Sequence, residues 1–167
     1  MLFKNKYLLY IFITIPLLLS HAPWGQHQVY RQMHMLIMCS KKDGEAYNFT
    51  KKLENTFSIY LPKAKARVAR APHVERIIDM LKTDQIPLAI LSHDLFQILI
   101  SSDSEYKNFF KDNIKIIYSF SNMLLIADKK FNSDKSIKIY DALIKASNDD
   151  SKSDFQIIIK DDLNILF

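Results

Sequence analysis

Hydrophobic and polar residues follow two different periods along the first half of the chain. Segments 33–39 and 86–91 are nearly continuous apolar runs that are too short for helices, a pattern typical of strands buried on both faces of a sheet. Segment 46–60 instead repeats apolar residues every three or four positions, which predicts an amphipathic helix that ends before Pro62. This part of the chain therefore predicts a strand, a loop and a helix.

Two further units of this kind follow. Residues 63–68 alternate basic and small apolar side chains, which predicts a strand with one wet face, near a sheet edge and halted by Pro72. Helical spacing returns at 74–81, and again after the strand at 86–91. Each crossover is long enough for parallel pairing. The order of these units predicts an α/β sheet with right-handed crossovers.

The second half of the chain predicts strands at 114–120 and 123–128, then a helix capped by Ser133 or Asp134. Segment 101–107 is polar and is expected to be a surface loop. Two closing segments, F-Q-I-I-I-K and L-N-I-L-F, are typical of one strand or two short ones. Together these elements predict a single α/β domain, a three-layer sandwich with a mostly parallel sheet.

The N-terminal segment has the composition of an export signal. A short basic stretch, M-L-F-K-N-K, precedes an apolar run at 7–20 that is shorter than a membrane span, and S-H-A follows with the small residues that a signal peptidase inspects. We expect a signal peptide at 1–22, an extension at 23–32 and one folded lobe at 33–167, in a periplasmic or secreted protein. Because Pro23 is a poor residue after a cleavage site, the alternatives are cleavage a few residues later and an uncleaved membrane anchor.

Charge and cysteine content narrow the function classes. The formal net charge is +5, and without Lys4 and Lys6 of the leader it is 21 minus 18, or +3. This excess is small and its bases are scattered, so we do not expect nucleic-acid binding. The only cysteine, Cys39, lies in an apolar run and has no partner for an internal disulfide, which predicts a buried thiol and a fold held by its core alone.

Segment 27–39 combines imidazole, thioether and thiol side chains, which are ligands that copper prefers. On a strand, however, odd and even positions point to opposite faces, so the set divides and we interpret it as core. No G-x-S-x-G, H-E-x-x-H or cysteine motif with a partnered base occurs in the sequence. We therefore expect no catalytic residues, no metal and no cofactor. The soft-ligand set consists of His27, Met33, His34, Met35, Met38 and Cys39.

Polar residues gather where three of the expected strands end. In open parallel sheets, ligands bind beyond the carboxyl ends of the strands, where helix N-termini present free N–H groups. Hydroxyls, one planar cation and two imidazoles at such an edge suit a small carboxylate or a similar anion. For Ser92 and Asp94, a plain helix N-cap is the alternative, and Lys41 and Lys42 are interpreted as solvated. The candidate ligand-binding residues are Ser40, Arg70, His73, Ser92, His93 and Asp94.

The order of elements and their hydrophobic pattern resemble a known family. The segment H-M-L-I-M-C-S, the helix after it, and the stretch L-P-K-A-K-A-R-V-A-R-A-P-H-V-E-R-I-I-D-M-L-K-T-D-Q-I-P-L-A-I-L-S-H-D are similar to the first lobe of type 2 periplasmic solute-binding proteins, with the pattern of the solute receptors of TAXI-type TRAP transporters. The stretch N-I-K-I-I-Y-S-F-S-N-M-L-L-I-A-D-K-K resembles their return segment. The resemblance implies an exported protein that binds a small anionic solute for a membrane transporter. It places the six candidate residues where the family's first lobe contacts its ligand.

Two departures from the family pattern favour a second function. S-K-K-D-G-E stands where the receptors carry a glycine-rich run, and no second lobe is inserted near 101–113. Without a second lobe, no hinge closes over a ligand. The alternative is a non-catalytic accessory or interaction protein of the cell envelope that has kept the fold without solute binding.

Overall fold

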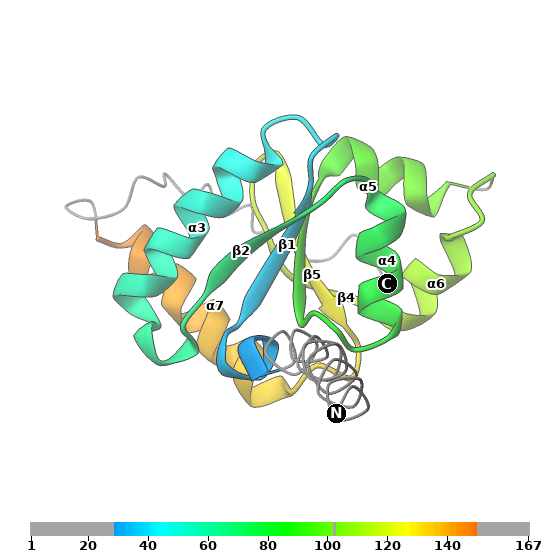
Figure 1. Ribbon diagram of the computed structural model, residues 1–167. Helices are drawn as coiled ribbons and strands as arrows, with labels where there is room; N and C mark the ends of the chain where they lie inside the picture. The colour runs from blue at the N-terminus through cyan, green and yellow to red at the C-terminus, as the bar shows by residue number, and fades with distance from the viewer. Residues whose placement is uncertain (1–28, 102, 150–167) are drawn as a thin grey trace, which may run out of the picture. The chain divides into compact units, whose positions relative to one another are not determined.

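Strands and helices alternate around one five-stranded sheet, which makes this a single α/β domain (Figure 1). The computed structural model describes residues 29–101 and 103–149. The signal peptide expected at 1–22 and the closing strands expected after 154 lie outside the described residues. In chain order the elements are β1 (Leu36–Ser40), α3 (Ala46–Tyr60), the 3-10 turn η1 (Pro62–Ala64), β2 (Arg67–Ala71), α4 (Val74–Lys82), β3 (Leu88–Ser92), α5 (His93–Ile100), α6 (Lys107–Asn113), β4 (Ile114–Ser119), β5 (Met123–Asp128) and α7 (Ser133–Ser147).

The sheet is mixed, with the strand order β2-β1-β3-β5-β4. β1 pairs in parallel with β2 and β3, whereas β5 pairs antiparallel with β3 and β4. The antiparallel half departs from the mostly parallel sheet that we expected. Its cause is the short link around Ser121 and Asn122, because a link of this length joins neighbouring strands only as a hairpin. β1 to β4 nevertheless share one direction, so their carboxyl ends lie at one edge of the sheet, called the carboxyl edge below, and their amino ends at the other, the amino edge.

The core divides between the two faces of the sheet. Ile37 and Cys39 of β1 pack in one cluster with residues of α3 and α7. Leu36 and Met38, one position out of phase, pack in the other with residues of α4, α5 and α6. This alternation follows from the two-residue period of a strand. Fully burying a leucine, isoleucine or phenylalanine stabilises the fold by roughly 1.5–3 kcal/mol, so the two clusters account for most of its stability.

The thiol of Cys39 lies at the centre of this core, as expected. Its side chain is 0% exposed, and Sγ donates to the carbonyl oxygen of Ala69 at 3.7 Å. Burial raises the pKa of the thiol. Met38 and Cys39 point into opposite clusters, which confirms for these two residues that the soft ligands divide between faces. His27 lies outside the described residues, and within the part of the chain that the structure describes no group of three His, Cys, Asp or Glu side chains could hold a metal ion.

The strand expected at 63–68 lies further along the chain. Residues 62–64 form η1, and β2 runs from Arg67 to Ala71. Pro62 suits the start of a helical turn because its φ is already fixed near the helical value. Lys65 closes the turn with a φ of 47°, in the left-handed region. The alternation of basic and small residues before Ala66 therefore belongs to a turn.

Two details of the second half also differ from expectation. Part of the segment after residue 101 forms α6, whose Phe110 is buried among α5 and β4 residues. α7 is capped by Asn132, whose side chain accepts from the N–H of Lys135 at 3.1 Å, and not by Ser133 or Asp134. Among the described residues, no helix is both long enough and apolar enough to span a membrane.

Candidate functional site

The turns that follow β1 and β2 lie together at the carboxyl edge with the start of α5, which follows β3 directly. This placement follows from the parallel pairing of these adjacent strands, and the loops meet at the top of the view in Figure 1. An open cleft of about 560 Å³ lies among them. Two of the six candidate residues, Ser40 and His73, line it. The full lining is Ser40, Lys42, Asp43, His73, Val74, Glu75, Leu95 and Ile98.

A buried carboxylate, Asp43, joins the turn after β1 to the end of β3. It is 8% exposed, and it accepts the hydroxyl of Ser92 at 2.5 Å and the N–H of Ser92 at 2.9 Å. The hydroxyl oxygen of Ser92 also accepts from the N–H of Leu95 at 3.2 Å, which caps α5. Ser92 is therefore an N-cap, which was the alternative to its ligand-binding role. Asp43 was not among the expected site residues, because an aspartate before Gly44 is also an ordinary turn residue.

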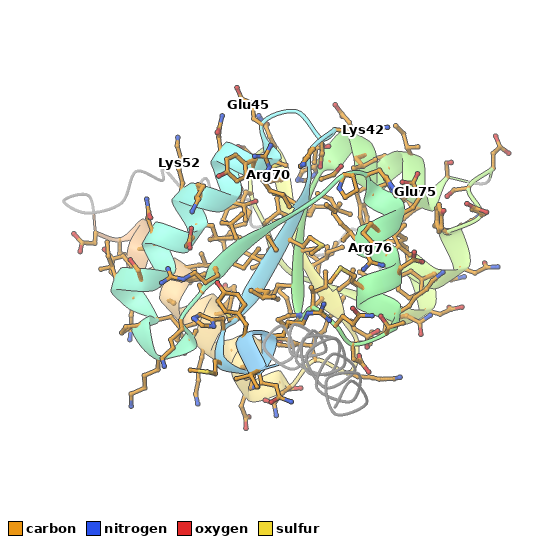
Figure 2. All side chains as sticks on the ribbon, in the orientation of Figure 1. Lys42, Glu45, Lys52, Arg70, Glu75 and Arg76 are labelled. Atoms are coloured by element: carbon orange, nitrogen blue, oxygen red, sulfur yellow. The ribbon has the colours of Figure 1, made fainter. Side chains whose placement is uncertain are left out.

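Ser40 shapes the turn beneath the cleft. It is 2% exposed, and its hydroxyl oxygen accepts from the N–H of Lys42 at 3.1 Å. The same turn brings the N–H of Asp43 to the carbonyl oxygen of Ser40 at 3.4 Å. The exposed Lys42 side chain lies at the mouth of the cleft, close to the first turn of α4, which carries Glu75 (Figure 2).

His73 and Glu75 form an ion pair at the start of α4. His73 Nδ1 lies 2.7 Å from Glu75 Oε2, and the two side chains are 48% and 51% exposed. The pKa of Glu75 is lowered, chiefly by a hydrogen bond from its own backbone N–H. Burial, the next largest effect, opposes this, and the bond and charge of His73 and the charge of Lys42 add to the lowering. His73 occupies the N-cap position of α4 without a side-chain cap bond. Its imidazole therefore faces the cleft with Glu75 as its partner.

The remaining candidates do not line the cleft. The guanidinium carbon of Arg70 lies 4.2 Å from the ring centroid of Tyr47 on α3, on the other side of the sheet (Figure 2). His93 Nε2 lies 3.0 Å from the carbonyl oxygen of Phe120, and because a carbonyl only accepts, Nε2 carries the proton and donates. His93 thus fastens the β4–β5 hairpin. Asp94 is exposed in the first turn of α5, where the helix dipole favours a carboxylate.

The cleft combines a charged part with an apolar part. Lys42, His73 and Glu75 supply the charges, while Val74, Leu95 and Ile98 supply apolar surface, and Ile98 is 65% exposed. The Ser92 hydroxyl donates to the carboxylate of Asp43, which fixes its position beside the cleft. This chemistry suits the reversible binding of a small molecule that has one charged group and one apolar group.

No protein-family model matches the chain, and neither a curated protein nor a solved structure matches it.

Proposed function

We propose that the protein is an exported, non-catalytic module that binds a small anionic solute weakly in the cleft at the carboxyl edge. The observation that carries this proposal is the convergence of the turns after β1 and β2 and of the first part of α5 around one open cleft, with Lys42 and His73 at its mouth. The protein would act in the periplasm or after secretion, and deliver the solute to a membrane transporter or another envelope protein.

The fold supports a relationship to solute-binding proteins. Helices cover both faces of the sheet, and four of the five strands share one direction. We infer from this a three-layer sandwich in which β5 alone runs against the direction of the other strands. Such an arrangement corresponds to a single lobe of the type 2 periplasmic solute-binding proteins, including the TAXI-type receptors, that the sequence resembles.

The expected ligand is a carboxylate with a short apolar group. Its carboxylate would bind the ammonium of Lys42 beside the imidazole of His73, while the apolar group covers Leu95 and Ile98. Exposed charge pairs contribute only about 0.2–1 kcal/mol each, and an open cleft excludes little water. We therefore expect dissociation constants on the order of 1 mM.

Titration of the ¹⁵N-labelled full chain with short-chain monocarboxylates and dicarboxylates tests this function by NMR. Amide shifts at 41–45, 73–75 and 95–98 are expected. Lys42→Gln should weaken binding several-fold, and the matched change Lys52→Gln, on the exposed side of α3, should leave it unchanged (Figure 2). Shifts confined to residues outside these three segments would contradict the proposal.

A second function is favoured by Asp43. This carboxylate already accepts the N–H and hydroxyl of Ser92 at the start of α5, where an anionic ligand would bind. The protein would then be an accessory or interaction protein of the envelope that has lost solute binding. Its expected outcome is the absence of shifts with any acid, together with co-purification of a membrane complex that survives Arg70→Ala and His73→Ala.

A further inference from the structure

The amino edge carries an excess of basic side chains that the carboxyl edge lacks. Within the described residues, the segments 62–66, 82–87, 110–113 and 129–135 hold seven lysines and three aspartates. The corresponding carboxyl-edge segments, 41–45, 72–75, 93–94 and 120–122, hold two lysines and four acidic residues. All seven amino-edge lysines are exposed. They are Lys63, Lys65, Lys82, Lys111, Lys129, Lys130 and Lys135.

Internal contacts account for some of these cations. Lys82 and Lys111 lie in the last turns of α4 and α6, where the helix dipole favours a positive charge. The ammonium of Lys82 also lies 5.0 Å from the ring centroid of Phe109. Lys129 donates to the carbonyl oxygen of Lys111 at 3.0 Å. These residues have structural roles and do not by themselves indicate a partner.

The four remaining lysines make no such side-chain contact among the described residues, and three of them lie outside the α-helices. Lys63, Lys65 and Lys130 lie outside the α-helices, and no hydrogen bond or ion pair of their ammonium groups occurs among the described residues. Lys65 adopts a φ of 47°, a conformation that favours glycine. Glycine would fit the backbone of this turn better, yet a lysine occupies the position. The amino edge thus presents charge toward the outside.

The layout of these charges fits a flat partner. Lys63 and Lys65 precede β2, Lys130 follows β5, and three strand intervals separate β2 from β5 in the sheet. At about 4.8 Å per interval the two groups are roughly 14 Å apart, in a row along the edge. The cleft described above lies at the opposite edge. A row of separated cations suits a broad anionic surface better than a single small anion.

We propose that the amino edge docks on the anionic lipid surface of a membrane. The chain enters the sheet at this edge, because Leu36 is the first residue of β1. The apolar run at 7–20 precedes His34 by only the residues 21–33, which span at most about 45 Å when extended. The amino edge is the first part of the domain after that run, whether the run is a cleaved signal peptide or a retained anchor. Each base near an anionic bilayer strengthens binding roughly fivefold, and salt screens the effect.

Lysine acylation of the full chain tests this docking. The protein is mixed with vesicles of phosphatidylcholine alone, or of phosphatidylcholine with 30% phosphatidylglycerol, treated briefly with an amine-reactive ester and analysed by peptide mass spectrometry. Lys63, Lys65 and Lys130 are expected to be labelled at least threefold more slowly on the anionic vesicles, and 0.5 M KCl should restore their labelling. Lys41, Lys42 and Lys52 should label equally in both vesicles and so provide the reference within the same molecule.

A matched pair of variants separates surface charge from folding. The triple change Lys63→Gln, Lys65→Gln, Lys130→Gln should abolish the salt-sensitive protection of the remaining Lys111 and Lys135. The control triple change Lys41→Gln, Lys42→Gln, Lys52→Gln alters the net charge equally and should leave that protection intact. Equal labelling in both vesicle types, protection that ignores salt, or protection of the carboxyl-edge set would overturn the proposal. So would protection of the amino edge by duplex DNA but not by the anionic vesicles.

Discussion

The two edges of the sheet use polar side chains in opposite ways. At the carboxyl edge, Asp43 binds Ser92, His73 binds Glu75, and the ring of His93 binds the hairpin. At the amino edge, several lysines extend outward with no partner among the described residues. The edge richer in candidate chemistry therefore has most of its groups already bonded within the protein. A polar side chain indicates a binding site only when the fold leaves it available.

The largest loss of stability should come from removing the carboxylate of Asp43, which joins the turn after β1 to the end of β3. Asp43→Ala is expected to lower the free energy of unfolding by about 3 kcal/mol, because the half-buried N–H and hydroxyl of Ser92 would lose their acceptor. Urea denaturation measures the change. Asp94→Ala, an exposed carboxylate at the same edge, is the matched control and should cost less than about 0.5 kcal/mol. Equal losses in both variants would mean that Asp43 does not link these two segments.

A smaller loss of stability should distinguish the two histidines of the carboxyl edge, His73 and His93. His93→Ala removes a donor to the half-enclosed Phe120 carbonyl and should cost about 1–1.5 kcal/mol. His73→Ala removes only an exposed ion pair and should change stability by less than about 0.5 kcal/mol. Thermal unfolding by circular dichroism compares the variants. A larger loss for His73 would reverse our interpretation of which histidine is structural.

Replacing Glu54 tests whether an internal ion pair reduces the positive charge that the amino edge presents. Its carboxylate bonds Lys51 at 2.6 Å and Arg67, the first residue of β2, at 3.3 Å. Burial raises the pKa of Glu54, but the bonds and charges of Lys51 and then Arg67 outweigh it, so the pKa is lowered from its usual 4.5. A depressed pKa contributes stability that is present above the unfolded value and is lost as the pH falls through the folded value.

Glu54→Gln should therefore cost about 1 kcal/mol at neutral pH and flatten the loss of stability below about pH 4.5. Urea denaturation at several pH values measures this slope, with the exposed Glu45→Gln as control. If the amino edge docks on anionic lipid, the released Arg67 should also strengthen binding to phosphatidylglycerol vesicles. An unchanged acid slope would contradict the structural role of Glu54.

The smallest stability effect is expected for the outward-facing lysines. The triple change of Lys63, Lys65 and Lys130 to glutamine should alter the free energy of unfolding by less than about 0.5 kcal/mol, because these ammonium groups have no internal partner among the described residues. Urea denaturation of the triple variant beside the wild type checks this. A loss of more than 1 kcal/mol would show that the cations stabilise the fold and would weaken the contrast between the edges.

Much of the fold could be predicted from the sequence because its pattern is local. The continuous apolar run of β1 and the amphipathic spacing of α3 depend on neighbours a few residues apart. The alternating pattern of residues 63–66 led to a wrong strand prediction, because alternation over so few positions also occurs in a turn. α6 was missed because its seven residues offer only the pair Phe109 and Phe110 as an apolar signal. The mixed sheet was missed because strand direction depends on the hairpin at 120–122 and not on the strand residues.

The candidate site was predictable in position but not in detail. Parallel neighbours place their following loops at one edge, so Ser40, His73 and Ser92 could be assigned to it from the order of elements alone. The bond between Asp43 and Ser92 joins residues 49 positions apart, and no local pattern reports such a pair. The same holds for the contact of His93 with the hairpin, which depends on β5 lying beside β3. Whether a polar side chain is free to bind a ligand depends on its tertiary contacts, which the local sequence does not reveal.

The chemical reactivity of Cys39 reports how often the folded sheet opens. The thiol is the only one in the sequence and is sealed within the central strand of the parallel half. A maleimide would therefore modify it only in molecules whose sheet has separated. The rate of that modification, followed over hours under native conditions, would measure how often β1 opens, and no cysteine would have to be introduced for the measurement.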